Sequence, residues 1–364
     1  RDIKRYGKTL YKKLFKPLEK TIKGNKDIII IPDGELAKIP FESLIIEEEK
    51  SGRPVYLMEK YRLKYVQSAS LLSILRKHYH RDKETNSFIG FGDPVYDYEN
   101  FKQGKPEQGS MKIFATESTE VTEPILSHED TRSDAKEKRL SSVPSVSSVA
   151  ISSPQAFGDE IKEIHRSRYA RAGGIMNRLP RSGEEVNSIG QLFKKSAQKW
   201  AVHSREQASE DKAKSLEMKD FDYIHFACHG LLNDDFQSLV LSQLPPEKSP
   251  EDGYFTLNEI MNCDYNAKLV VLSACQTGTG KMERAEGVTG LTRAVMYAGT
   301  PAVVASLWKV DDKATKELMV RFYKNILEKN LDKTEALRQA KLELLKNPKY
   351  SSPLFWSAFV LYGE

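Results

Sequence analysis

Two reactive side chains stand where apolar runs of the sequence end. The stretch FDYIHFACHG (221–230) ends in His229 and Gly230, and LVVLSACQTG (269–278) carries Cys275. The whole chain of 364 residues has only seven histidines and three cysteines. A thiol with a pKa of about 8.5 is mostly protonated near neutral pH, and a neighbouring imidazole can accept its proton. The pair therefore predicts nucleophilic catalysis by a cysteine.

The glycine beside the histidine has a place in the same chemistry. Because Gly230 has no Cβ, its backbone can approach a substrate closely. We expect the backbone N–H groups of Gly230 and Cys275 to hold the oxyanion of a tetrahedral intermediate. Losing one such donor typically costs about 2.7–4 kcal/mol of transition-state stabilisation.

A parallel sheet would bring these residues together. Short apolar runs bounded by Gly, Pro or Asp predict buried strands at 27–34, 61–66, 87–94, 221–227, 269–274, 301–308 and 355–363. Helical patterns alternate with them at 69–79, 183–196, 205–218, 286–298, 312–328 and 332–346. This alternation predicts an α/β fold, a mostly parallel sheet with helices on both faces. Sites in such folds form beyond the carboxyl ends of strands, where His229 and Cys275 both stand.

Composition narrows the class of protein. Hydrophobic residues make up 39% and charged residues 29%, and no apolar run approaches the roughly 18 residues that cross a bilayer. Three cysteines without disulfide spacing are typical of reduced thiols, so we expect a cytoplasmic protein that does not bind membranes. The net charge of +5 comes from the first 20 residues, which argues against direct nucleic-acid binding by the core.

The pattern also divides the chain. Residues 1–26 predict a basic amphipathic helix that docks on its own core, in preference to a membrane surface or a partner, and leads into a domain at 27–364. The abrupt start without Met suggests a piece of a longer chain. Residues 95–176 are rich in Ser and charge and predict a long polar insertion, with a spacer favoured over a cleavage or docking site.

Other sites fit the sequence poorly, and we expect neither a metal nor a cofactor. GTGK (278–281) lacks the spacing of a phosphate-binding loop. A zinc site from Cys228, His229, Cys263 and Cys275 has no paired ligand spacing and would consume the nucleophile. His225 is interpreted as a satisfied core histidine in preference to a catalytic one. The remaining histidines are expected on solvated surface: His78, His80, His128, His165 and His203.

Several stretches together resemble the CHAT domain, a caspase-like and separase-like group of cysteine peptidases often found behind tetratricopeptide repeats. They are IIIIPDGELAKIPFESLI, SASLLSIL, GFGDP, RLPRSGEEV, FDYIHFACHG, LVVLSACQTGTGKMERAEGVTGLTRAVMYAGTPAVVASLWKVDD and SSPLFWSAFVLYGE. The resemblance spans nearly the whole chain except the insertion. It implies a caspase-type fold, with His229 as general base, Cys275 as nucleophile and the oxyanion donors at Gly230 and Cys275. Cys228, where Thr is more usual in the family, is expected to turn away from His229 as a buried filler.

The resemblance also implies a substrate pocket. SLWKVDD is similar to a separase segment in which an Asp serves the pocket for a basic residue before the scissile bond, so Asp311 and Asp312 are the candidates. Either Asp also suits the cap of the next helix, and we expect at least one of them to cap it.

These inferences lead to a cysteine endopeptidase of protein substrates. An always-active endopeptidase would be harmful, so we expect latency until a partner protein or an upstream tetratricopeptide-repeat region repositions the pocket loops. The resemblance is compatible with bacterial defence systems, including CRISPR-associated and gasdermin-cleaving ones. The alternative is a non-catalytic interaction or signalling module with the same fold, although such a module would be expected to lose His229 or Cys275.

Overall fold

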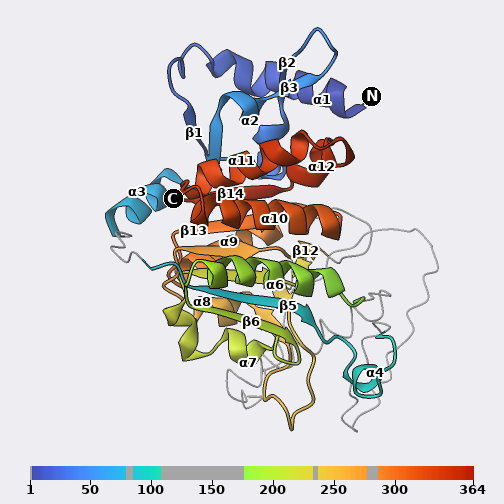
Figure 1. The fold of residues 1–364 in the computed structure, drawn as a ribbon. Helices are drawn as coiled ribbons and strands as arrows, with labels where there is room; N and C mark the ends of the chain where they lie inside the picture. The colour runs from blue at the N-terminus through green and yellow to red at the C-terminus, as the bar shows by residue number, and fades with distance from the viewer. Residues whose placement is uncertain (1, 79–84, 108–175, 233–236, 277–285) are drawn as a thin grey trace, which may run out of the picture. The chain divides into compact units, whose positions relative to one another are not determined.

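A computed structural model describes residues 2–78, 85–107, 176–232, 237–276 and 286–364 (Figure 1). Its centre is an eight-stranded sheet in the spatial order β1 (Asp27–Ile30), β4 (Arg62–Tyr65), β14 (Phe359–Gly363), β13 (Ala302–Ser306), β11 (Leu269–Leu272), β7 (Tyr223–Ala227), β5 (Phe88–Pro94) and β6 (Trp200–Arg205). All neighbouring pairs are parallel except β13 with β14. The predicted α/β class with a mostly parallel sheet is confirmed.

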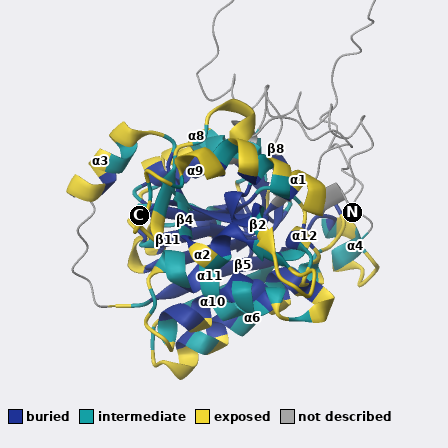
Figure 2. Ribbon diagram, turned by 90° about the horizontal axis from the view of Figure 1, so that it is seen from above, coloured by how far each residue is buried: buried dark blue, intermediate teal, exposed yellow. Residues whose placement is uncertain are grey.

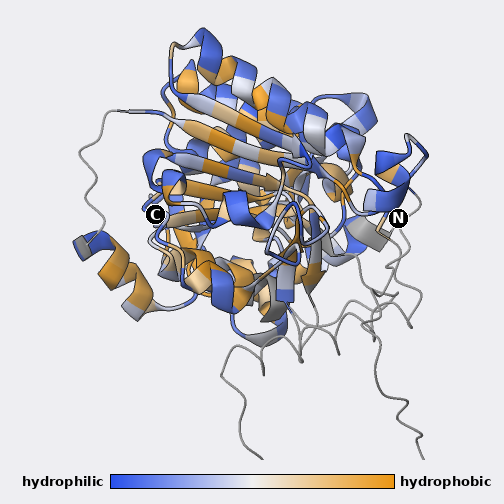
Figure 3. Cartoon of the chain, turned by 90° about the horizontal axis from the view of Figure 1, so that it is seen from below, coloured by the Kyte–Doolittle hydropathy of each residue, from blue (hydrophilic) through white to orange (hydrophobic). Residues whose placement is uncertain are grey.

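Helices cover both faces of this sheet (Figure 2). One face carries α6 (Pro180–Lys195), α10 (Asp312–Leu327), α11 (Lys333–Leu345) and α12 (Pro353–Trp356), and the other carries α8 (Leu257–Met261) and α9 (Glu286–Tyr297). Alternate residues of β11 serve the two sides: Val270 lies in the cluster with α9, and Val271 in the cluster with α10. Hydrophobic residues are accordingly frequent in the inner strands, as in the LVVL of β11, while the helices mix hydrophobic and hydrophilic residues (Figure 3).

A second, four-stranded sheet continues beyond the carboxyl ends of the two central strands. Its order is β10 (Tyr254–Thr256), β9 (Gln237–Val240), β8 (His229–Leu232) and β12 (Cys275–Gln276). β8 follows β7 after one residue, and β12 follows β11 after two. Two neighbouring strands of the large sheet are thus each continued by a strand of the small sheet, and these two strands pair with each other. We did not predict this small sheet, because its strands are too short to show a periodic pattern.

The edge strand β6 was also missed. All six of its residues are half-buried, so its sequence, WAVHSR, lacks the apolar run that marked the other strands. The helix predicted at 205–218 is wrong as a single element, since Arg205 has a φ of 56° and only α7 (Glu210–Ala213) and a 3-10 turn (Leu216–Asp220) follow. His203, expected on the surface, packs against Phe91 with ring centroids 5.1 Å apart.

Smaller elements complete the described chain: α1 (Asp2–Leu10) with a π-helical turn (Tyr11–Phe15) and a 3-10 turn (Lys16–Leu18), β2 (Ile45–Glu48), β3 (Pro54–Tyr56), α2 (Leu57–Lys60), α3 (Ala69–His78) and α4 (Tyr98–Lys102), with further 3-10 turns at Gly34–Lys38, Phe41–Ser43 and Pro348–Tyr350. Tyr11 and Phe15 of the first segment are buried in the main core. Most of the predicted insertion, residues 108–175, lies outside the described residues. No helix within the described ranges has the length and apolarity to cross a membrane.

Helix α6 reaches the carboxyl end of β5 through glycine. A Cβ added at Gly92 would lie 2.6 Å from the carbonyl oxygen of Ser182, and one at Gly183 would lie 2.9 Å from the Cβ of Asp93. Asp93 also donates its backbone N–H to the Ser182 hydroxyl at 2.7 Å. This close approach fixes the start of α6 beside the edge of the sheet where His229 lies.

Candidate active site

The small sheet brings positions 229 and 275 together. Cys275 and His229 are register partners of the parallel pair β12–β8, and Gln276 pairs with Gly230. Neighbouring strands lie about 4.7–4.9 Å apart, so the two backbones are adjacent. Sequence reasoning placed both residues at strand ends, and the structure places those ends side by side.

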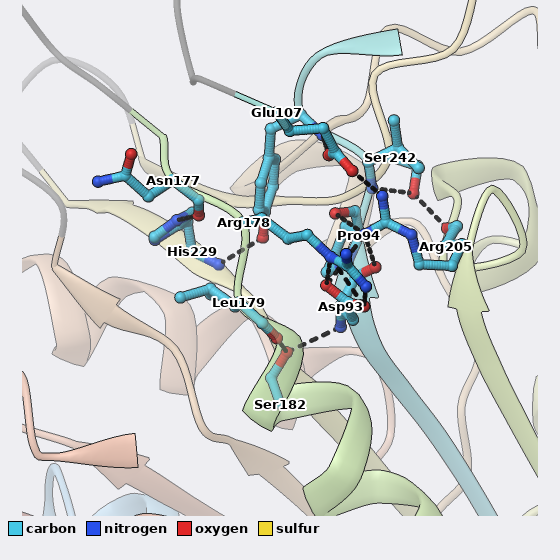
Figure 4. Close-up of polar contacts among 12 residues, drawn as sticks. Asp93, Pro94, Glu107, Asn177, Arg178, Leu179, Ser182, Arg205, His229 and Ser242 are labelled. Carbon is cyan, nitrogen blue, oxygen red and sulfur yellow. Dashed lines mark hydrogen bonds and ion pairs between the residues drawn. The ribbon is translucent and has the colours of Figure 1, made fainter. Parts of the chain in front are cut away.

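His229 is enclosed, with 4% of its surface exposed. Its ring packs on Tyr96 with centroids 4.8 Å apart, and its backbone N–H donates to the Tyr96 hydroxyl at 3.1 Å. Its Nε2 lies 2.8 Å from the backbone carbonyl oxygen of Asn177 (Figure 4). These contacts fix both the position and the plane of the imidazole.

The Asn177 contact also determines the tautomer. A carbonyl oxygen can only accept, so Nε2 must carry the proton, and in the neutral ring Nδ1 then holds the free lone pair. No group of the described residues hydrogen-bonds Nδ1. The imidazole is therefore prepared to accept a proton at Nδ1.

Burial lowers the pKa of His229 from 6.5 to about 4; the hydrogen bond to Asn177 opposes this change, and the positive charge of Lys309 adds to it. The ring is consequently neutral at physiological pH, which is the state that a general base requires.

A narrow pocket opens beside the histidine. Its wall is formed by Leu179, Ser182, Glu185, Cys228, His229, Ser273, Lys309, Asp312 and Thr315. The volume is about 40 Å³. That space holds a few water molecules at most, so the pocket is narrow as it stands.

The two candidate aspartates are used differently. Asp311 caps α10, and its Oδ1 accepts from the backbone N–H groups of Lys313 and Ala314 at 3.1 Å each. The expected helix cap is confirmed for this residue. Asp312 instead lies in the pocket wall, where burial raises the pKa of its carboxyl group, with Lys309 acting in the opposite direction.

The remaining predicted residues lie nearby or in the core. Gly230 belongs to β8 and pairs with Leu239 of β9 on its other side. Cys228 is buried in the apolar cluster that includes α9, as expected of a filler, and it also contributes to the pocket wall. Cys263 is half-buried at the end of α8, with its Sγ 3.3 Å from the carbonyl oxygen of Glu259.

His225 is a satisfied core histidine, as predicted. It is fully buried, its Nε2 lies 2.7 Å from Oε1 of Glu185, and its Nδ1 lies 3.3 Å from the Tyr323 hydroxyl. Both ring nitrogens are occupied, so this imidazole is not available for proton transfer with a substrate.

One acidic cluster has the spacing of metal ligands. Carboxylate oxygens of Glu210, Glu251 and Glu259 lie within 4.8 Å of one another. The ammonium group of Lys214 contacts all three, at 3.1, 2.7 and 3.4 Å. The chain's own cation thus occupies the position that a metal ion would take, although burial still raises the pKa of Glu210 to about 8, with Glu259 adding to the effect.

Three functional candidates were missed from sequence. Asn177 acts through its backbone, which leaves no side-chain signal. Tyr96 contacts His229 from the loop after β5, far away in the chain. Glu185 stands in RLPRSGEEV, a stretch that resembled the family, so that resemblance was the available signal.

This site lies in a chain that belongs to the CHAT domain family: the family model matches residues 4–364. Tetratricopeptide repeat protein 28 of Homo sapiens is 32% identical over 124 residues, 34% of this chain, and the protein of the same name from Mus musculus is 31% identical over 124 residues. The chain spans about 5% of the length of these relatives.

Solved structures show weaker likeness. A Saccharomyces cerevisiae separase–securin complex matches 90% of this chain and 15% of its own at 14% identity, with a TM-score of 0.43. The Arg-specific cysteine proteinase gingipain R matches 50% of this chain and 41% of its own at 12% identity, with a TM-score of 0.37.

Proposed function

We propose that the chain is a cysteine endopeptidase domain in which Cys275 is the nucleophile and His229 the general base. The observation that carries the proposal is the register pairing of residues 275 and 229, combined with an imidazole whose Nε2 is committed to Asn177. Membership of the CHAT family supports the same chemistry.

The reaction proceeds through an acyl-enzyme. Nδ1 of His229 takes the thiol proton as the sulfur of Cys275 forms a bond to the scissile carbonyl carbon. The backbone N–H groups of Gly230 and Cys275 hold the oxyanion. His229 then returns the proton to the leaving amine as the C–N bond breaks, and water hydrolyses the thioester.

Asp312 is the preferred specificity residue of the two aspartates. It lies in the same pocket wall as His229, whereas both described hydrogen bonds of Asp311 go to the start of α10. A carboxylate in a narrow pocket suits a substrate side chain that carries a cation, so the proposed substrates are proteins cut after Arg or Lys.

The narrow pocket supports latency. The pocket has a volume of about 40 Å³, room for a few water molecules, so we propose that it widens before a substrate side chain enters. The relatives named for tetratricopeptide repeats support an upstream repeat region or a partner protein as the activator.

A thiol-directed covalent probe tests the dyad. We expect labelling of Cys275 near neutral pH that is lost in Cys275→Ala and reduced at least tenfold in rate in His229→Ala, because the thiolate needs the base. Cys228 and Cys263 serve as internal controls for non-specific labelling. Labelling of Cys275 that does not respond to His229→Ala would favour the alternative, a non-catalytic interaction module of the same fold.

A peptide-library cleavage profile tests the specificity, with Cys275→Ala as the blank. The proposed upstream region is added if the chain alone cleaves no peptide. We expect a preference for Arg or Lys before the cut that disappears in Asp312→Ala and persists in the matched variant Asp311→Ala. A profile that ignores Asp312→Ala would remove Asp312 from the pocket.

A further inference from the structure

The segment that supplies the Asn177 carbonyl has little structure of its own. Residues 176–179 lie in neither a helix nor a strand, and Asn177 and Arg178 are both exposed. In the part of the chain that the structure describes, no backbone-to-backbone hydrogen bond holds residues 176–178. Met176 is buried and restrains the segment on one side of Asn177, so a carbonyl that stays 2.8 Å from His229 needs a further restraint on the other side.

The side chain next to that carbonyl provides one. Arg178 forms a two-pronged contact with Asp93: its Nε lies 3.0 Å from Oδ1 and its Nη2 lies 2.7 Å from Oδ2 (Figure 4). Such bidentate pairs fix orientation as well as distance. Asp93 is buried at the end of β5, so it ties the loose segment to the rigid sheet.

Asp93 is itself held in an uncommon conformation. Its φ is 50°, in the left-handed region that residues with a Cβ rarely adopt. Arg205 fixes it there, because Nη1 donates to Oδ1 of Asp93 at 2.9 Å and to the Asp93 carbonyl oxygen at 3.0 Å. Arg205 also pairs with Glu107 and lies over the ring of Phe101 at 4.9 Å.

From this geometry we propose that Asp93 and Arg178 are positioning residues for the general base. Their ion pair holds the Asn177 carbonyl on Nε2 of His229 and so keeps Nδ1 as the nitrogen that accepts the thiol proton. The catalytic meaning of Nδ1 rests on the proposed function, whereas the control of the tautomer does not.

A purely structural role would give a different signature. Ion pairs with an exposed partner add little stability, and the Arg178 side chain is 45% exposed, so its loss is expected to leave the melting temperature nearly unchanged. The positioning role instead predicts a change confined to His229. Arg178 is therefore a better probe than Asp93, whose removal also takes away one of the two carboxylates that pair with Arg205.

The test is the tautomer of His229, read from imidazole nitrogen NMR of protein labelled with ¹⁵N-histidine at pH 7, with the signal assigned through His229→Gln. We expect a single Nε2–H tautomer in the unmodified chain and a mixture in Arg178→Gln. Arg178→Lys, which keeps the charge and loses the fork, should give a smaller change in the same direction. Arg321→Gln is the matched control, since Arg321 is 38% exposed and bridges two glutamates elsewhere.

Kinetics add a second readout if cleavage is observed. Arg178→Gln should lower kcat by roughly 10- to 100-fold with little change in KM, because orientation of the base is lost while the pocket is kept. An unchanged single tautomer in Arg178→Gln, or an equal change in Arg321→Gln, would overturn the positioning role. Absence of cleavage and of His229-dependent labelling would instead count against the proposed function. The NMR result would still decide whether Asp93 and Arg178 position the ring.

Discussion

Two histidines, one at the pocket rim and one in the interior, differ in how their ring nitrogens are hydrogen-bonded. His225, in the interior, has both ring nitrogens occupied, by Glu185 and by Tyr323. His229, at the rim, has its described side-chain hydrogen bond at Nε2 alone. The comparison teaches that four residues of chain separate a structural imidazole from one prepared for proton transfer, and that the neighbours decide which is which.

The largest expected difference is in catalysis. His229→Ala should lower kcat/KM by roughly 10⁴-fold or more, because the base is lost, while the protein remains folded. His203→Ala, which removes a histidine of the edge strand, is the matched control and should stay within about twofold. Steady-state kinetics with the substrate from the library profile measure both, and comparable losses in the two variants would contradict the assignment of the base.

For stability, the interior histidine should matter more than the rim histidine. His225→Ala leaves Glu185 buried without its partner, so the free energy of unfolding should fall by roughly 3–5 kcal/mol. Tyr323→Phe removes one neutral hydrogen bond to the same ring and should cost about 1 kcal/mol. Urea unfolding at pH 7 measures both losses, and a His225→Ala loss no larger than that of Tyr323→Phe would mean that the histidine is not a structural centre.

The free energy of unfolding should depend on pH because His229 is buried. The pKa of His229 is lowered to about 4 when folded, chiefly by burial, against 6.5 when unfolded. Between these pH values the unfolded chain binds a proton that the folded chain does not bind. The contribution of neutral His229 to the free energy of unfolding is therefore complete above pH 6.5 and is lost as the pH falls through about 4. It amounts to about 3 kcal/mol.

His229→Gln should remove this part of the acid sensitivity. Urea unfolding of both proteins at several pH values from 4 to 8 gives the difference. Parallel curves for the two proteins would show that His229 titrates normally and is not enclosed.

The smallest expected effect is a difference in stability between variants of the two aspartates, Asp311 and Asp312. Asp311→Ala removes the cap of α10 and should lower the free energy of unfolding by about 1 kcal/mol. Asp312→Asn should cost less, because burial already disfavours its charge. Thermal unfolding at pH 7 compares them, and equal losses would indicate that both aspartates support the helix.

Much of this arrangement was predictable from local pattern. The buried strands were visible because strands covered on both faces must be apolar throughout, as in Leu269–Leu272. His229 and Cys275 were visible because each interrupts such a run at its end. Strand β6 was not, because an edge strand that is half-exposed carries no continuous apolar run.

The sequence by itself determined the fold class, the two candidate catalytic residues at strand ends and the presence of a helix cap at 311–312, because each depends on neighbours along the chain. Only the tertiary structure decided which groups hydrogen-bond His225, which aspartate enters the pocket wall and which carbonyl holds Nε2 of His229. These outcomes depend on contacts such as Asn177 with His229 and Glu185 with His225. The physical reason is that the packing of α6 on β5 creates them, and that packing brings together residues that are distant in the chain.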